Sequence, residues 1–207
     1  MKIIRTILFA GTALLCVPGV SSAQRWFGAA TWNISIPDGD TKKFVDETSY
    51  RGFGMDFRKL INDKTTIGLT TSWEVLHERT TESIEVESDN AGITITGSQD
   101  RYINSFPIML GLHRYLGVEG GTRPYFGINA GGFWLIQTLR VGLAEWEVDS
   151  WEWGVMPEAG LIIPFQSGAA LIANARYTLG LTGENLRGDD STLSYWGVRV
   201  GFAWEQY

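Results

Sequence analysis

Hydrophobic and polar residues alternate along most of this chain, most clearly between positions 123 and 164. In the segments 123–134 and 153–164, one face is apolar and uncharged, and the other carries many glycines together with Asn129 and Glu158. A period of two residues is typical of β-strands rather than helices. A soluble antiparallel sheet would place its charged face in water. The glycines on the charged face instead indicate a confined space, as in a closed barrel with lipid outside and a narrow polar interior.

The same alternation divides the chain into about eight strands. Short turns follow the second, fourth and sixth strands, and longer loops follow the others, with residues 139–149 joining the fifth to the sixth. Outer-membrane barrels have an even number of strands, short periplasmic turns and longer extracellular loops. The pattern therefore predicts an all-β fold, an eight-stranded antiparallel up-and-down transmembrane β-barrel with both termini in the periplasm. The expected strands are 25–36, 50–59, 65–75, 102–115, 123–134, 153–164, 169–180 and 193–204.

The first 23 residues have the pattern of a secretory signal peptide. Lys2 and Arg5 precede an apolar stretch, and the small residues 21–23 form a cleavage site. No other segment approaches the ~18 consecutive apolar residues of a membrane-spanning helix. We therefore expect a signal peptide over 1–23 and a barrel domain over 24–207, located in the cell outer membrane. Cys16, the single cysteine, lies in the signal peptide, so the mature chain forms no disulfide.

The segment 78–100 is acidic but still alternates. Ile84 and Val86 lie among glutamates, and residues 89–92 have the composition of a tight turn. We expect a hairpin that projects beyond the membrane into water. Its edges could add strands to an extracellular partner, or the hairpin could simply be solvated.

Tryptophan is frequent, with nine residues in 207, and its positions fit two membrane interfaces. Trp196 and Trp204 share a face of the last strand and would lie roughly 20 Å apart along the membrane normal, close to the ~25 Å between aromatic girdles. In the alternative, a soluble sandwich or lipocalin-like barrel, the aromatics would be core and the glycine-rich face would need water. The predicted girdle consists of Trp26, Trp73, Trp134, Trp153, Trp196 and Trp204.

Several strand motifs resemble one known family. The phrases FPIMLGLHRYLG (106–117), RPYFGINAGG (123–132), PEAGLIIP (157–164), ANARYTLG (173–180) and YWGVRVGFAW (195–204) are similar to those of small bacterial outer-membrane β-barrel proteins, of the OmpA transmembrane domain and OmpX type. The resemblance covers most of the chain after the signal peptide and implies the same barrel fold, with little information on activity. One departure is that the outward-facing row ends at Trp204, with Tyr207 out of phase.

Charged residues also lie on the inward face. An eight-stranded barrel is just wide enough for side chains to fill it, and buried charges need partners. Glu158, Arg176 and Arg199 lie on neighbouring strands and could form one cluster. The charges form either a structural plug or a gate whose pairs rearrange to open a narrow conduit. The predicted interior charge network consists of Asp56, Arg58, Glu74, Glu158, Arg176 and Arg199, and His113 points inward in the same register.

Other chemistry has little support in the sequence. The net charge of −6 argues against a nucleic-acid partner. No cysteine or histidine cluster has metal-ligand spacing, no phosphate-binding loop motif occurs, and neither His77 nor His113 belongs to a recognisable Ser–His–acid arrangement. We therefore predict no catalytic residues, no metal and no cofactor.

The expected function is a structural or surface-interaction role in a Gram-negative-type cell envelope. The expected partners are outer-membrane lipid and lipopolysaccharide, with periplasmic chaperones and the barrel assembly machinery acting during export. The alternatives are a narrow porin-like channel gated by interior Arg/Glu pairs and a lipid A-modifying enzyme, since some barrels that resemble this one modify lipopolysaccharide.

Overall fold

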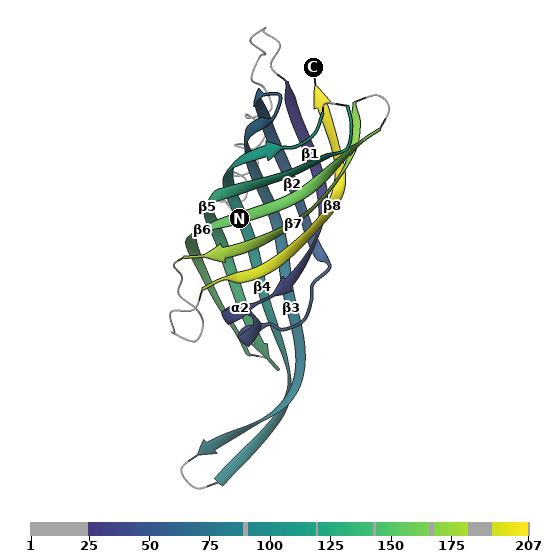
Figure 1. The fold of residues 1–207 in the computed structure, drawn as a ribbon. Coiled ribbons are helices and arrows are strands. Elements are labelled where there is room, and N and C mark those ends of the chain that lie inside the picture. Colours follow the sequence, from purple (N-terminus) through teal and green to yellow (C-terminus); the bar gives the residue numbers. More distant parts are fainter. Residues whose placement is uncertain are drawn as a thin grey trace, which may run out of the picture.

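The computed structural model describes residues 25–88, 91–118, 120–142, 144–165, 168–181 and 192–206. In these residues, eight antiparallel strands form one closed barrel, in which consecutive strands pair and β8 closes on β1 (Figure 1). The predicted eight-stranded barrel is confirmed, whereas the predicted signal peptide, 1–23, lies outside the described residues. The strands are β1 (Trp26–Pro37), β2 (Arg51–Asn62), β3 (Thr65–Ser88), β4 (Ala91–Tyr115), β5 (Arg123–Val141), β6 (Ala144–Pro164), β7 (Ala169–Gly180) and β8 (Ser194–Gln206).

The alternation in the sequence becomes the two faces of the barrel wall. On β2, Met55 and Phe57 are exposed on the outside, whereas Asp56 and Arg58 are fully buried inside. Successive side chains of a strand point to opposite faces, so one register sets every inward position. β8 keeps that register to its end, where Gln206 pairs with Trp26.

The two ends of the barrel differ. At one end the connections between β2 and β3, β4 and β5, and β6 and β7 are short, and β1 begins there beside the last residues of β8. We call this the short-turn end and the opposite one the loop end. Both strands that carry the ends of the described chain therefore reach the short-turn end, as an even number of antiparallel strands requires. At the loop end, only the connections after β1 and β7 are long, whereas β3 with β4 and β5 with β6 continue as long paired strands.

At the loop end, β3 to β6 extend well beyond the other strands. β3 and β4 remain paired out to Ser88 and Ala91, so the hairpin expected over 78–100 is present (Figure 1). The expectation of a loop over 139–149 is wrong, because β5 and β6 are paired as far as Val141 and Ala144. Apolar residues still alternate with charges in this segment, and the cross-strand pair Arg140–Glu145, 3.1 Å apart, supports a strand pair in water.

A short helix that the sequence pattern does not predict, α2 (Gly39–Phe44), lies in the connection between β1 and β2. It is fastened to the start of β8, where the Ser194 amide donates to Thr41 Oγ1 (2.7 Å). Val45, directly after α2, is fully buried in the apolar cluster at the loop end. On the exposed side of α2, the hydrogen bond from Lys43 Nζ to Asp40 Oδ1 (2.6 Å) lowers the pKa of the Asp40 carboxyl. The first loop is therefore a packed cap over this end of the barrel.

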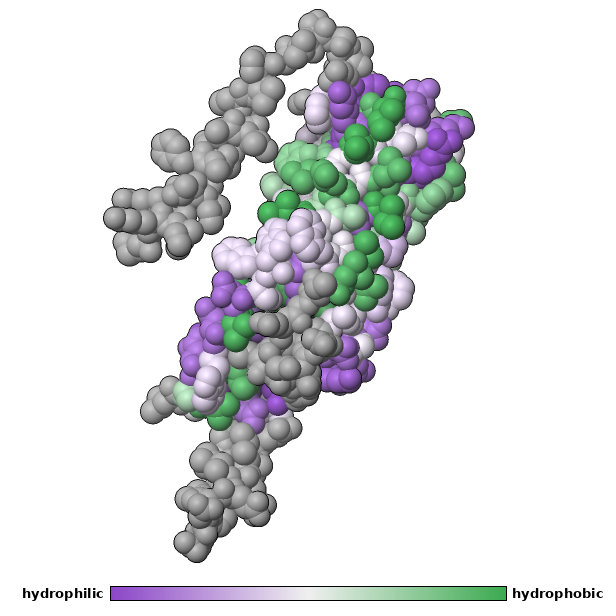
Figure 2. All heavy atoms as spheres, turned by 90° about the vertical axis from the view of Figure 1, so that its left-hand side faces the viewer, coloured by the Kyte–Doolittle hydropathy of each residue, from purple (hydrophilic) through white to green (hydrophobic). Residues whose placement is uncertain are grey.

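The outer surface is apolar around its middle. On the face seen in Figure 2, hydrophobic residues gather over the upper and middle part and hydrophilic residues toward the two ends. The exposed side chains of the middle zone include Ile67, Leu110, Ile128, Val200 and Phe202. No helix in the described ranges has the length and hydrophobicity that a membrane crossing requires.

Candidate functional site in the barrel interior

Arg58 is the centre of the interior charge network. It lies on the inward face of β2, two residues after Asp56, and its Nη2 atom is 3.1 Å from Asp56 Oδ2. The same nitrogen reaches across the barrel to Glu158 Oε1 on β6, at 2.8 Å. Its Nη1 atom donates to the Tyr115 hydroxyl at 3.1 Å. Arg58 therefore links three strands through the interior, because its partners come from β2, β4 and β6.

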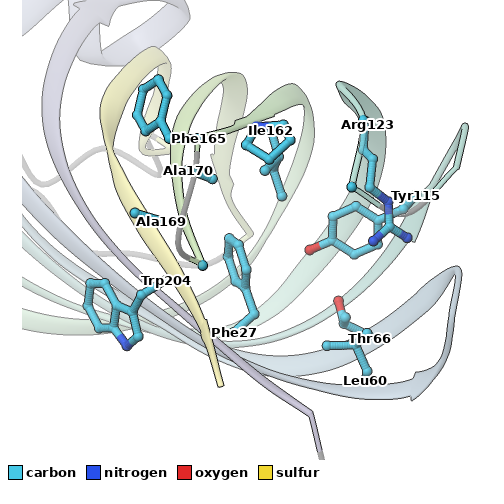
Figure 3. Close-up of a pocket in the computed structure, with 14 residues that line it drawn as sticks. Phe27, Leu60, Thr66, Tyr115, Arg123, Ile162, Phe165, Ala169, Ala170 and Trp204 are labelled. Carbon is cyan, nitrogen blue, oxygen red and sulfur yellow. The ribbon is translucent and has the colours of Figure 1, made fainter. Parts of the chain in front are cut away.

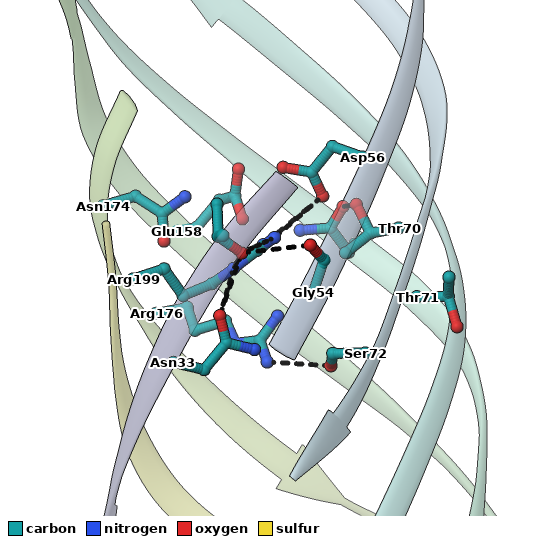
Figure 4. Close-up of polar contacts among 12 residues, drawn as sticks. Asn33, Gly54, Asp56, Thr70, Thr71, Ser72, Glu158, Asn174, Arg176 and Arg199 are labelled. Carbon is teal, nitrogen blue, oxygen red and sulfur yellow. Dashed lines mark hydrogen bonds and ion pairs between the residues drawn. The ribbon is translucent and has the colours of Figure 1, made fainter. Parts of the chain in front are cut away.

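A second part of the network lies nearer the loop end. Arg199 on β8 is 3.3 Å from Asp56 and also donates to Thr31 and Asn33 on β1 (Figure 4). Arg176 on β7 forms an ion pair with Glu74 on β3, where Ser72 also accepts from it at 3.1 Å.

Asp56 joins the two parts of the network, because it contacts both Arg58 and Arg199. Within the second part, Asn33 connects Arg199 to the Arg176–Glu74 pair. Its side-chain nitrogen donates to Glu74 (3.2 Å), and its oxygen accepts from Arg199 (3.3 Å). The three arginines and three carboxylates of the predicted network thus form one connected set of compensating charges. Buried ions are tolerated when they are paired in this way.

The expected cluster of Glu158, Arg176 and Arg199 does not form. Glu158 and Arg176 are opposite one another in the β6–β7 register, yet Glu158 turns to Arg58 and Arg176 to Glu74. Charged side chains are long compared with the radius of so narrow a barrel. Apart from Arg58 and Asp56, which are neighbours on the inner face of β2, they therefore pair across the lumen, where opposite charges are available.

Apolar and aromatic layers enclose the network. Toward the short-turn end, Phe27, Tyr115 and Tyr125 are buried, and the Arg58 guanidinium lies 4.9 Å from the Tyr125 ring centre. Toward the loop end, a second cluster contains the side chains of Met109, Phe133, Met156 and Tyr195, with Val45 from the first loop. The cross-section is thus occupied by side chains at three successive levels.

Three further residues point into the lumen. One of them, His113, was predicted to do so but without a partner, and the other two, Glu152 and Tyr195, were not predicted. His113 was expected inside, and its Nε2 atom lies 3.0 Å from Glu158 Oε1. Glu152 is 1% exposed, and neither carboxylate oxygen has a hydrogen-bond partner among the described residues. Tyr195 is fully buried at the start of β8. Glu152 could have been found from the sequence, because it lies on the same face as Glu158, six residues earlier.

All six tryptophans of the predicted girdle are on the outer surface, between 39% and 60% exposed. Near the loop end, direct strand pairing aligns outward aromatics into one row: Trp32 with Phe53, Phe53 with Trp73, and Phe106 with Trp134. Trp26 and Trp204 mark the short-turn end. That these rows lie at membrane interfaces remains a prediction.

The two histidines lie in different environments. His113 is enclosed in the lumen, whereas His77 lies on the outside of β3, stacked on Tyr102 (4.3 Å between ring centres) and 3.6 Å from Asp100. Ser98, two residues before Asp100, accepts a hydrogen bond from Arg79 (3.0 Å). Within the described residues, no group of three or more His, Cys, Asp or Glu side chains could hold a metal ion.

Comparison with known proteins agrees with this architecture. No protein-family model matches the sequence, and a search of curated proteins finds no match. The outer membrane protein OprG from Pseudomonas aeruginosa superposes with a TM-score of 0.51 at 16% identity, covering 89% of this chain and 97% of that chain. Outer membrane protein W of E. coli has a TM-score of 0.48 at 14% identity, covering 90% of this chain and 100% of that chain. The chain therefore has the fold of the small eight-stranded outer-membrane β-barrel proteins.

Proposed function

We propose that this chain is an outer-membrane protein with a structural or surface-interaction role, and that its barrel is closed to ions. The proposal rests on the way side chains fill the lumen. Four charged residues there, Asp56, Arg58, Glu74 and Arg199, are 0% exposed and form ion pairs with residues of other strands. A narrow barrel filled by paired charges and flanking apolar layers has no continuous aqueous path.

The proposed location in the outer membrane rests on the outer surface. Apolar side chains are exposed around the middle of the barrel, between aromatic residues near both ends, as a lipid-facing band requires. Contact with lipid and lipopolysaccharide, export with a signal peptide, and assembly with chaperones and the barrel assembly machinery belong to the same proposal. So does the orientation, with the short-turn end in the periplasm.

The first test is envelope fractionation followed by gel electrophoresis with and without boiling. We expect the mature chain in the outer-membrane fraction, migrating faster when unboiled because the closed barrel stays folded. A soluble periplasmic protein without a heat shift would contradict the proposal and favour a lipocalin-like carrier.

Planar bilayers separate a closed barrel from a gated channel. We expect the wild-type protein to give no resolved current steps, and the double variant Arg176→Ala, Arg199→Ala to conduct, because removing two buried guanidinium groups leaves space for water. Stepwise currents from the wild type would instead support a gate built from the interior Arg/Glu pairs.

The surface role is assigned to the β3–β4 hairpin, which projects furthest from the barrel (Figure 1). We expect replacement of residues 82–97 by a two-residue turn to abolish adhesion of expressing cells to a responsive surface while leaving the heat shift intact. Adhesion equal to the wild type would argue that the hairpin is only solvated. We further propose that the chain has no enzymatic activity.

A further inference from the structure

A pocket of about 150 Å³ opens at the short-turn end of the barrel (Figure 3). It lies between this end and the aromatic layer that encloses the charge network. Its walls come from the ends of all eight strands and from two of the short turns. This volume is comparable to that of apolar cavities that bind a single benzene ring. The pocket is separate from the network, because the Tyr115 ring stands between Arg58 and this space.

Two buried polar groups of the pocket lack partners. The Thr66 hydroxyl is fully buried and has no hydrogen-bond partner among the described residues. The same is true of Nε of Arg123, a residue that is 9% exposed. Unpaired buried donors of this kind are uncommon in native proteins. Both groups could therefore donate a hydrogen bond to an acceptor atom of a bound ligand.

The Arg123 guanidinium is held in a fixed position. Its Cζ atom lies 4.8 Å from the centre of the Tyr115 ring, and its Nη2 atom donates to the carbonyl oxygen of Asp63 in the β2–β3 turn. An arginine that is already oriented loses little side-chain entropy when it binds an anion. Within the described residues, the Arg123 guanidinium forms no ion pair with a carboxylate. Its charge is therefore available for a ligand.

The remaining walls are apolar. Phe27, Ile162 and Ala170 are buried in the cluster at the short-turn end and line the pocket. In Figure 3, the Phe27 ring and Ile162 lie on one side of the space, and the Arg123 guanidinium and Thr66 on the other. One half of the pocket is thus apolar and large enough for a single aromatic ring. The other half carries the positive charge of Arg123 and the hydroxyl group of Thr66.

We propose that this pocket binds a single-ring aromatic carboxylate. The ring packs against Phe27 and Ile162, and the carboxylate accepts hydrogen bonds from Arg123 Nε and from the Thr66 hydroxyl. A neutral amide of the same shape lacks the charge that a buried guanidinium favours, and a cation is repelled. This inference does not depend on whether the barrel conducts or on its role at the cell surface.

The test uses the full barrel in lipid nanodiscs and the probe 4-fluorobenzoate, observed by fluorine NMR with empty nanodiscs as the partition control. We expect saturable binding of 4-fluorobenzoate and much weaker binding of 4-fluorobenzamide. Arg123→Gln should weaken binding roughly tenfold or more, because a charge-assisted hydrogen bond is lost. The matched control is Arg114→Gln, since Arg114 lies on the outward face of β4 and donates to Thr65 instead.

Two further variants keep the proposal testable if Arg123→Gln prevents folding. Thr66→Val removes the hydroxyl without changing shape and should weaken binding several-fold, and Ala170→Leu fills the apolar half and should abolish it. Each variant is checked for an unchanged heat shift. The proposal is overturned if no binding exceeds that of empty nanodiscs, if the amide binds as well as the carboxylate, or if Arg123→Gln and Arg114→Gln behave alike.

Discussion

Arg58 and Glu158 are 100 residues apart in the sequence, and their side chains are 2.8 Å apart in the barrel interior. Neither side chain is exposed to solvent. The pair joins β2 to β6 through the lumen rather than through the sheet, so it fixes the two halves of the barrel relative to one another.

We expect Glu158→Gln to lower the free energy of unfolding by about 3–5 kcal/mol, because it removes one charge of a buried pair. The affected cation is Arg58, which loses one of its two carboxylate partners and keeps Asp56, and not Arg176 or Arg199; the contact of His113 with Glu158 is also changed. The measurement is the denaturant midpoint in detergent, followed by the loss of the heat-shifted band.

The matched control for this prediction is Glu145→Gln. Glu145 also pairs with an arginine, Arg140 at 3.1 Å, but both side chains are about half exposed. A surface pair of this kind contributes no more than about 1 kcal/mol. Equal midpoint shifts for the two variants would show that the interior pair is hydrated and not buried.

We expect Gly131→Val to destabilise the barrel by about 1–3 kcal/mol through overpacking. A Cβ atom at Gly131 would collide with the carbonyl oxygen of Ile108 and the backbone of Met109, which cannot move aside. Gly121→Ala is the control, because a Cβ atom there meets Val118 only at ordinary contact distance, 3.6 Å. The temperature at which the unboiled band disappears measures both, and a tolerated valine would mean that the interior is wider than these contacts indicate.

We expect Val45→Asp to release the first loop without unfolding the barrel. Val45 is 0% exposed in an apolar cluster, where an unpaired carboxylate is strongly unfavourable. Trypsin should then cleave faster after Lys42 or Lys43, whose side chains are exposed but lie in α2. Glu47→Gln, at an exposed position nearby, should leave the cleavage rate unchanged, and equal rates for all three proteins would contradict the packed cap.

We expect overproduction of the protein to leave the mass profile of intact lipid A unchanged. His113 is enclosed in the lumen, and the Ser98 hydroxyl is engaged by Arg79 rather than by His77. Mass spectrometry of extracted lipid A provides the measurement. A lost or added group that disappears in a His77→Ala variant would identify an enzyme and overturn this part of the proposal.

The alternation of residues predicted the strands, their inward and outward faces and the burial of all six charges in the network. It could do so because side-chain direction in a strand depends on local geometry alone. The continuation of β5 and β6 through 139–149 was not predicted, because the frequent charges of a strand pair in water, here Arg140, Glu145, Glu147 and Asp149, look like a loop in the sequence. Helix α2 was missed because its six residues are stabilised by contacts to β8, not by their own pattern.

The sequence by itself therefore determined that this chain forms a barrel and which residues face its interior. Only the tertiary structure decided the partners, namely Arg58 with Glu158, Arg199 with Asp56 and Arg176 with Glu74. The physical reason is that strand direction follows from a period of two, whereas pairing inside a narrow lumen depends on the stagger of all eight strands and on which charges meet across it.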